Sequence, residues 1–98
     1  MKKITKTQAI HALNRGITVT VYRDRVNPKN DLGVGVAVVH QDDLRFPNSH
    51  QISFDEASDE NLSPSKVLRA RFNRFLRYFD YYNSLSELGN KTCYAIDD

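Results

Sequence analysis

The sequence predicts an α+β fold with two layers, in which one long amphipathic helix packs on an antiparallel sheet of three to four strands. Residues 63–83 repeat apolar side chains with the period of a helix. Short segments on either side alternate apolar and polar residues, as strands do. A chain of 98 residues suffices for one such core, so we expect a single domain over residues 1–98.

The first predicted element is a short N-terminal helix over residues 4–16. Thr5 and Gln8 have the spacing of a capping box, in which each side chain satisfies a backbone N–H of the first turn. Gly16 can take the left-handed conformation that ends many helices. The apolar residues of this helix are small, so we expect it to pack as a secondary layer.

Three strand patterns follow the first helix, and a fourth closes the chain. Residues 17–22 alternate apolar side chains with Thr and Tyr, which indicates one buried face. Residues 33–40 are apolar on both faces, so we expect this strand in the centre of the sheet, with its glycines at a bulge or a close backbone approach. Residues 50–54 predict a short third strand, and residues 92–96 predict a last strand that pairs at an edge. Turn-forming segments join the early strands at residues 24–32 and 41–47.

The main helix is predicted from its ends and from its period. Ser63 can cap the first turn, and Pro64 stands at the first helical position, where its missing N–H costs nothing. Apolar side chains recur at steps of three and four and form one stripe that favours burial. We expect this stripe to be the centre of the core, with the members Leu68, Phe72, Phe75, Leu76, Phe79 and Tyr82.

Charge is segregated along the chain, although the formal net charge is only +2. Residues 1–29 carry a net charge of +6, residues 30–60 one of −6, and residues 61–80 one of +4. The acidic part includes residues 55–60, directly before the main helix. Such a chain can neutralise itself on folding, or it can present faces of opposite charge that steer a charged partner.

The amino-acid composition limits the classes of protein to which this chain can belong. Apolar residues make up 40% of the chain and charged residues 27%, which is typical of a globular domain. Apolar runs are far shorter than the ~20 residues of a membrane span, and the first residues lack a secretory signal, so we expect a cytoplasmic protein with no membrane partner. Cys93 is the single cysteine, which excludes an internal disulfide.

Catalytic motifs are missing from the sequence, which has no Walker loop, no G-x-S-x-G and no H-E-x-x-H. We therefore expect a protein that is not an enzyme, with no catalytic residues, no cofactor and no metal. Two alternatives stay open. A metal site would draw on His40 and His50 with Cys93 or Asp42, and their spacing matches no ligand pattern. A nuclease would need carboxylates whose geometry the sequence does not fix, namely Asp42, Asp43, Asp55 and Glu56.

The polar side of the main helix is the candidate binding surface. Exposed tyrosine beside arginine is typical of protein-binding hot spots, and only Asp80 can offset the arginines from within the helix. The first hypothesis is a small non-enzymatic protein that inhibits a host protein, or a protein–nucleic-acid complex, by covering a functional surface. The side chains expected to contact that partner are Arg71, Arg74, Arg77, Tyr78 and Tyr81.

The second hypothesis is nucleic-acid binding by helix 64–83 together with the hairpin region 23–29. Arginine matches phosphate oxygens, and tyrosine can stack on a base. The expected phosphate contacts are Lys66, Arg69, Arg23, Arg25 and Lys29. In a third interpretation the arginines bind no other molecule and pair with the acidic segment 55–60 of the same chain.

Residues 8–19, QAIHALNRGITV, resemble the opening of a family of small phage proteins that begin A-L-x-A-L-x-x-G-x-x-V. The resemblance covers about an eighth of the chain. Some members of that group look like antagonists of bacterial defence, so the resemblance implies a compact binder that blocks a host enzyme. The residues that match the spacing are Ala9, Ile10, Ala12, Leu13, Gly16 and Val19.

Overall fold

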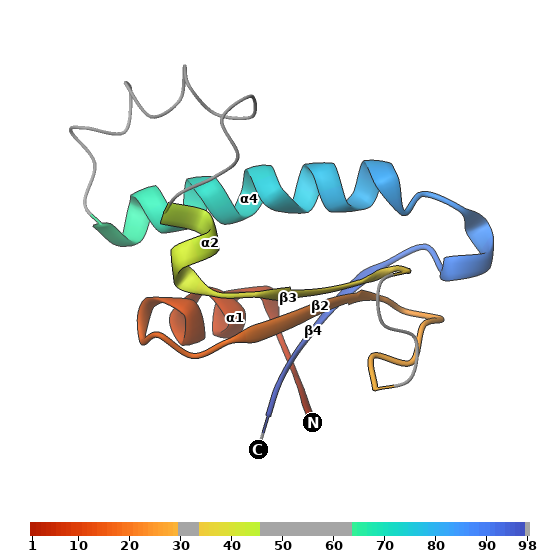
Figure 1. Ribbon diagram of the computed structural model, residues 1–98, viewed down its shortest axis with the longest axis horizontal. Helices are drawn as coiled ribbons and strands as arrows, with labels where there is room; N and C mark the ends of the chain where they lie inside the picture. The colour runs from red at the N-terminus through yellow and green to blue at the C-terminus, as the bar shows by residue number, and fades with distance from the viewer. Residues whose placement is uncertain (30–33, 46–63, 98) are drawn as a thin grey trace.

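A long helix lies across one face of a four-stranded antiparallel sheet in the computed structural model, which describes residues 1–29, 34–45 and 64–97 (Figure 1). The α+β architecture predicted from the sequence is thereby confirmed. In chain order, the elements are β1 (Lys2–Ile4), α1 (Lys6–Asn14), β2 (Val19–Arg23), β3 (Val36–Val39), α2 (Gln41–Arg45), α4 (Pro64–Tyr82), the 3₁₀ turn η1 (Ser86–Leu88) and β4 (Thr92–Ile96).

The described strands lie in the order β1-β4-β2-β3, and every neighbouring pair is antiparallel. Because β1 and β2 both run antiparallel to β4, they are parallel to each other, and α1 connects them. In the same way β3 and β4 are parallel, with β2 between them and α4 in their connection. The chain therefore builds two interlocked split β-α-β units, which place the last strand in the interior of the sheet.

Two predictions about strand position were wrong. The strand expected in the centre, residues 33–40, is the edge strand β3, and Val38 is 52% exposed. The strand expected at an edge, residues 92–96, lies between two neighbours, where Cys93 and Ala95 are buried. The interior position of β4 results from β1, which pairs with it and which the sequence did not reveal. The three residues of β1 include two exposed lysines, so only Ile4 carries a signal of burial.

The N-terminal helix is shorter than expected, but its ends follow the predicted chemistry. Thr5 N donates to Gln8 Oε1 at 2.9 Å, and Gln8 N donates to Thr5 Oγ1 at 3.1 Å, so the capping box is confirmed. Gly16 has a φ of 78°, the left-handed conformation that glycine adopts without strain. Residues 41–45, expected in a turn, form the short helix α2 instead, and Leu44 is buried in the core.

The core lies between α4, α1 and the sheet. Phe72 is fully buried, as are Leu13 of α1 and Val19 and Val21 of β2, and the core stripe of α4 is confirmed at Leu68, Phe72, Leu76 and Phe79. Phe75 is only partly buried and packs beside Phe72, with ring centroids 6.3 Å apart.

The prediction that Tyr82 belongs to the core was wrong, because Tyr82 is 72% exposed. At 100° per residue, Tyr82 lies about 80° around the helix from Phe72, whereas Asn83 lies about 20° from it. Asn83 therefore takes the inward position at the end of α4. The predicted strand 50–54, the acidic segment 55–60 and the cap Ser63 lie outside the described residues.

Replacing Phe72 with Ala is expected to lower the free energy of unfolding by about 3–5 kcal/mol, because its ring is fully buried. Phe75→Ala should have a smaller effect, because that ring is partly exposed, and Tyr82→Ala should change stability by less than about 0.5 kcal/mol. Urea denaturation of the three variants measures these differences. Equal losses for Phe72→Ala and Tyr82→Ala would contradict the described orientation of α4.

Candidate partner-binding surface

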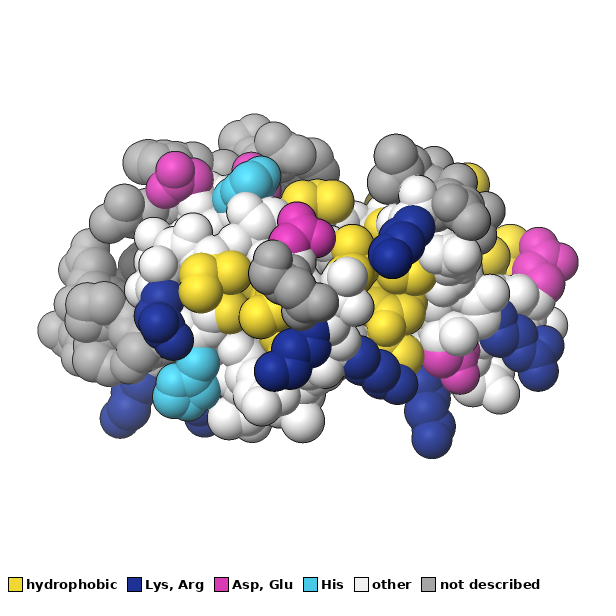
Figure 2. All heavy atoms as spheres, turned by 90° about the horizontal axis from the view of Figure 1, so that it is seen from below, with side chains coloured by type: hydrophobic (Ala, Val, Ile, Leu, Met, Phe, Trp, Pro, Cys, Tyr) yellow, Lys and Arg dark blue, Asp and Glu magenta, His cyan; other side chains and the backbone are white. Residues whose placement is uncertain are grey.

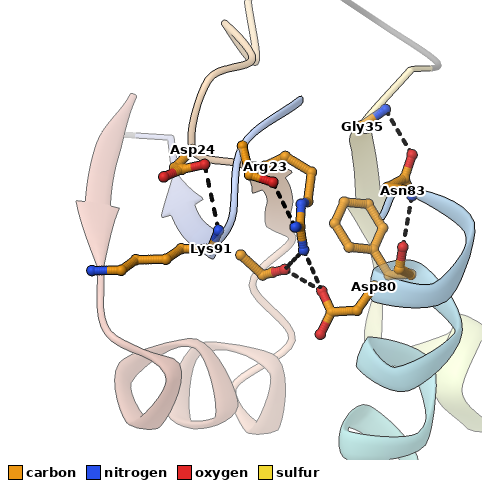
Figure 3. Close-up of polar contacts among 9 residues, drawn as sticks. Arg23, Asp24, Gly35, Asp80, Asn83 and Lys91 are labelled. Carbon is orange, nitrogen blue, oxygen red and sulfur yellow. Dashed lines mark hydrogen bonds and ion pairs between the residues drawn. The ribbon is translucent and has the colours of Figure 1, made fainter. Parts of the chain in front are cut away.

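Arg23 is buried at the point where α4 meets the sheet, with a side chain only 9% exposed. Its NH2 donates to the Gly89 carbonyl at 2.7 Å, and its NH1 lies 3.1 Å from Asp80 Oδ1 and 3.2 Å from Thr92 Oγ1. Thr92 Oγ1 in turn donates to Asp80 Oδ1. These groups come from β2, α4, β4 and the turn after η1, and Figure 3 shows Arg23 pointing toward Asp80 of α4. We call this set the Arg23 anchor.

The burial of Arg23 corrects its assignment as a nucleic-acid contact. The alternation of β2 places Val19, Val21 and Arg23 on the same face, which is the face covered by α4. A guanidinium that bonds a carboxylate, a hydroxyl and a carbonyl inside the protein is not available to a phosphate. Arg23 therefore holds the fold together and is removed from the candidate binding residues.

Asn83 and two glycines complete the attachment of α4 beside the Arg23 anchor. Asn83 Oδ1 accepts from Gly35 N at 3.1 Å, and Asn83 Nδ2 donates to the Phe79 carbonyl at 2.8 Å (Figure 3). Gly35 has a φ of 69°, and a Cβ there would lie 2.9 Å from Val26 Cγ2. Gly89 has a φ of 107°, and a Cβ there would lie 2.9 Å from Arg25 N. Both positions favour glycine because of their left-handed backbone. At Gly35 the crowding atoms belong to side chains, and not to the neighbouring backbone that was expected to approach segment 33–40.

Three tyrosines cover the opposite side of the last turns of α4. Tyr78 is 37% exposed, Tyr81 75% and Tyr82 72%. The rings of Tyr78 and Tyr82 stack with centroids 6.4 Å apart, and Tyr81 meets Tyr82 edge to face at 5.3 Å. We call these three residues the tyrosine cluster. Leu85, three residues after Tyr82, is 59% exposed.

The predicted arginine contacts divide into two groups. Arg77 is exposed and precedes Tyr81 by four residues, so both lie on one side of α4. Arg71 and Arg74 are half-buried, and Arg71 NH1 donates to the Leu44 carbonyl at 3.2 Å, which ties α2 to α4. The structure therefore groups Arg77 with the tyrosine cluster and gives Arg71 a packing role.

The remaining predicted contacts are exposed but lie on separate parts of the fold. Lys66 and Arg69 stand in the first half of α4, and Arg69 is eight residues, or about 12 Å, from Arg77 along the helix. Arg25 and Lys29 stand in the loop after β2. Sequence reasoning missed Tyr82 as a surface residue, although its position on the helical wheel relative to Phe72 carries that signal.

Two further tyrosines belong to the sheet and differ chemically from the tyrosine cluster. Burial raises the pKa of the Tyr94 hydroxyl, and the nearby Asp80 carboxylate and Cys93 thiol raise it further. Burial also raises the pKa of Tyr22, with Cys93 adding to this effect and Lys3 opposing it. The Tyr94 ring packs on Phe72 with centroids 6.0 Å apart, so it serves the core.

The described residues give little support to the metal site and the nuclease that the sequence left open as alternatives. His40 Nδ1 lies 2.8 Å from Thr18 Oγ1, and Asp43 Oδ2 accepts from His40 N at 2.9 Å at the start of α2. Among the described residues, no three His, Cys, Asp or Glu side chains gather as a metal site. His50, Asp55 and Glu56 lie outside that part of the chain. No helix in the described ranges is long and apolar enough to cross a membrane.

Comparisons of this chain with protein-family models, with curated proteins and with solved structures found no match. The surface that its own residues build is therefore the guide to its function. That surface consists of the tyrosine cluster and Arg77, held outward by the attachment of α4 to the sheet.

Replacing Asp80 with Ala is expected to lower the free energy of unfolding by about 2–3 kcal/mol. The change leaves the Arg23 guanidinium buried without its carboxylate, and the half-exposed position of Asp80 keeps the loss below that of a fully buried pair. Adding Arg23→Met should restore part of the loss, because no buried charge then remains. Urea denaturation of the wild type, both single variants and the double variant measures the coupling, and full additivity would show that the two side chains do not interact.

Proposed function

We propose that the protein is a non-enzymatic binding protein that docks on a macromolecular partner through the tyrosine cluster and Arg77. The observation that carries this proposal is a surface group of three tyrosine rings in which Tyr82 stacks on Tyr78 and meets Tyr81 edge to face, with Tyr81 and Tyr82 each more than 70% exposed. Large aromatic rings gathered at one surface position are the usual centre of a protein interface.

The physical basis of the proposal is preorganisation. Tyrosine presents a large ring at a low cost in side-chain entropy, and rings that already pack on each other lose less freedom on binding. The helix that carries them is held at its end by Asp80 and Asn83, so the surface is rigid before a partner arrives. Arg77 adds a fork of donors that suits a carboxylate on the partner. The partner surface that fits best is an apolar patch with an acidic group at its border.

The mode of action that we propose is inhibition of a host protein by covering a functional surface. This part rests on the resemblance of residues 8–19 to small phage proteins, some of which look like antagonists of bacterial defence. A rigid aromatic patch on a small domain is suited to this mode, because it can block a site without a reaction of its own.

Nucleic-acid binding is the second candidate, and one observation favours it. The cations Lys66, Arg69 and Arg77 are all exposed on α4 and extend over about 16 Å of helix, while exposed tyrosine rings near Arg77 can stack on unpaired bases. The loop residues Arg25 and Lys29 would extend this surface. The low net charge of +2 favours the protein partner.

The double change Tyr81→Ala and Tyr82→Ala is expected to abolish partner capture while altering the free energy of unfolding by less than about 0.5 kcal/mol, because both rings stand in solvent. The immobilised protein is incubated with nuclease-treated bacterial lysate, and stoichiometric bound protein is identified. Arg77→Ala should weaken capture. Arg15→Ala, which removes an exposed arginine beyond the end of α1, is the matched control and should leave capture unchanged.

Two outcomes would contradict the proposal: no stoichiometric protein is recovered, or the double tyrosine variant captures the same protein as the wild type. Titration of the protein with mixed-sequence single-stranded and duplex DNA at low salt separates the second candidate. Salt-sensitive shifts of the Lys66, Arg69 and Arg77 amide signals would favour nucleic acid. Unchanged signals at these positions would eliminate it.

A further inference from the structure

The outer side of β3 presents backbone N–H and C=O groups that can form hydrogen bonds with another strand. β3 pairs with β2 in a register that places Ala37 opposite Val21, and Arg23 N donates to the Gly35 carbonyl at 2.9 Å. Polar groups alternate in direction along an antiparallel ladder, so residues 35, 37 and 39 face β2. Val36 and Val38 therefore direct their N–H and C=O groups outward, and within the described chain these groups have no hydrogen-bond partner.

The two edges of the described sheet are protected differently. Natural sheets protect their edges with charged residues, above all lysine, and with proline or bulges. The edge formed by β1 carries the exposed residues Lys2 and Lys3. β3 consists of Val and Ala alone, and Val34 and Val38 are 60% and 52% exposed. An unprotected apolar edge indicates that a strand pairs there.

Apolar side chains continue from this edge across the side of the sheet opposite α4. Val36 lies beside Tyr22 in the register of β2 and β3, and Val38 shares their face. Figure 2 views the molecule from the side away from α4 and shows apolar side chains across the middle of this surface, with Lys and Arg side chains around them. A strand added to β3 would extend this apolar surface.

We propose that β3 pairs antiparallel with β3 of a second copy of the chain, about a twofold axis at Ala37. Val36 of one copy and Val38 of the other then exchange both of their backbone hydrogen bonds, and the same exchange repeats across the axis. The two sheets become one continuous sheet. The Val36 and Val38 side chains of both copies meet on the face opposite α4.

Charge complementarity selects a second copy in this orientation. The described loop that leads into β3 carries the exposed cations Arg25 and Lys29 against one exposed carboxylate, Asp24, so it is basic on balance. The helix α2, which follows β3, carries the exposed carboxylates of Asp42 and Asp43 against one cation, Arg45, so it is acidic on balance. Figure 1 shows that loop and α2 at opposite ends of β3. Antiparallel pairing brings the basic end of one copy beside the acidic end of the other, twice in each dimer. Parallel pairing would bring like charges together.

The dimer would also change how the tyrosine cluster acts, although neither proposal rests on the other. The ladder is short, so the pairing is weak and depends on concentration. Each dimer presents two tyrosine clusters, because they stand on α4 and take no part in the β3 ladder. A partner with two suitable sites would then be bound by both copies at once, with the gain in apparent affinity that linkage provides.

The test measures the mass of the full chain by sedimentation equilibrium over a wide range of concentration. The wild type should rise from the monomer mass of 11.3 kDa towards twice that value. Val38→Pro removes the outward N–H without removing a bond to β2, and edge strands tolerate proline at such positions. This variant should stay monomeric. Val38→Thr keeps the N–H and is the matched control that should still dimerise.

A second set of variants keeps the test decisive if Val38→Pro fails to fold. Val38→Lys places an edge-protecting charge at a half-exposed position and should abolish dimerisation while keeping the circular dichroism spectrum. Lys29→Glu should weaken association severalfold, whereas Lys6→Glu, the same charge change on α1, should leave it unchanged. A wild type that is monomeric at every concentration would overturn the proposal, as would a dimer that withstands both Val38→Pro and Val38→Lys.

Discussion

Arg23 bonds groups from three other parts of the chain, and the position of α4 depends on these bonds. Asp80 comes from the helix, Thr92 from the central strand β4, and the Gly89 carbonyl from the turn that joins them. Asp80 and Asn83 bond to Arg23 of β2 and to Gly35 before β3. Because successive residues of a helix are about 100° apart, Tyr81 and Tyr82 then point away from the sheet. The exposed aromatic surface is therefore a consequence of a buried cation.

This arrangement favours a defined helix orientation over maximal stability. Burying the Arg23 guanidinium costs desolvation that a half-exposed carboxylate offsets only in part, and the Arg23 Nε atom has no hydrogen-bond partner among the described residues. An apolar residue in its place would hold the helix less specifically, since apolar contacts tolerate rotation and sliding. A binding surface built on α4 needs a fixed helix, because a partner recognises rings only in a set arrangement.

The sequence predicted the elements with strong local signals and missed those set by distant partners. The period around Phe72 and the Thr5 cap identify their helices, because each signal lies within a few neighbouring residues. The order of the strands depends on β1, whose three residues are too few for a pattern. The alternation of β2 already placed Arg23 on the buried face, yet its partner Asp80 is 57 residues away and its charge suggested the surface. The exposure of Tyr82 was missed because steps of three and four average 3.5 residues and drift against the 3.6-residue turn of a straight helix, so the last member of the stripe leaves the buried side.

The orientation of α4 is tested most directly by the solvent accessibility of each tyrosine ring, measured by photochemically induced nuclear polarisation with a flavin dye. Tyr81 and Tyr82 are expected to give strong signals, because the Arg23 anchor turns them into solvent, and Tyr94 is expected to give no signal, because its ring packs on Phe72. Protection of Tyr81 and Tyr82, or a Tyr94 signal of equal strength, would contradict the orientation of α4 on which the binding surface depends.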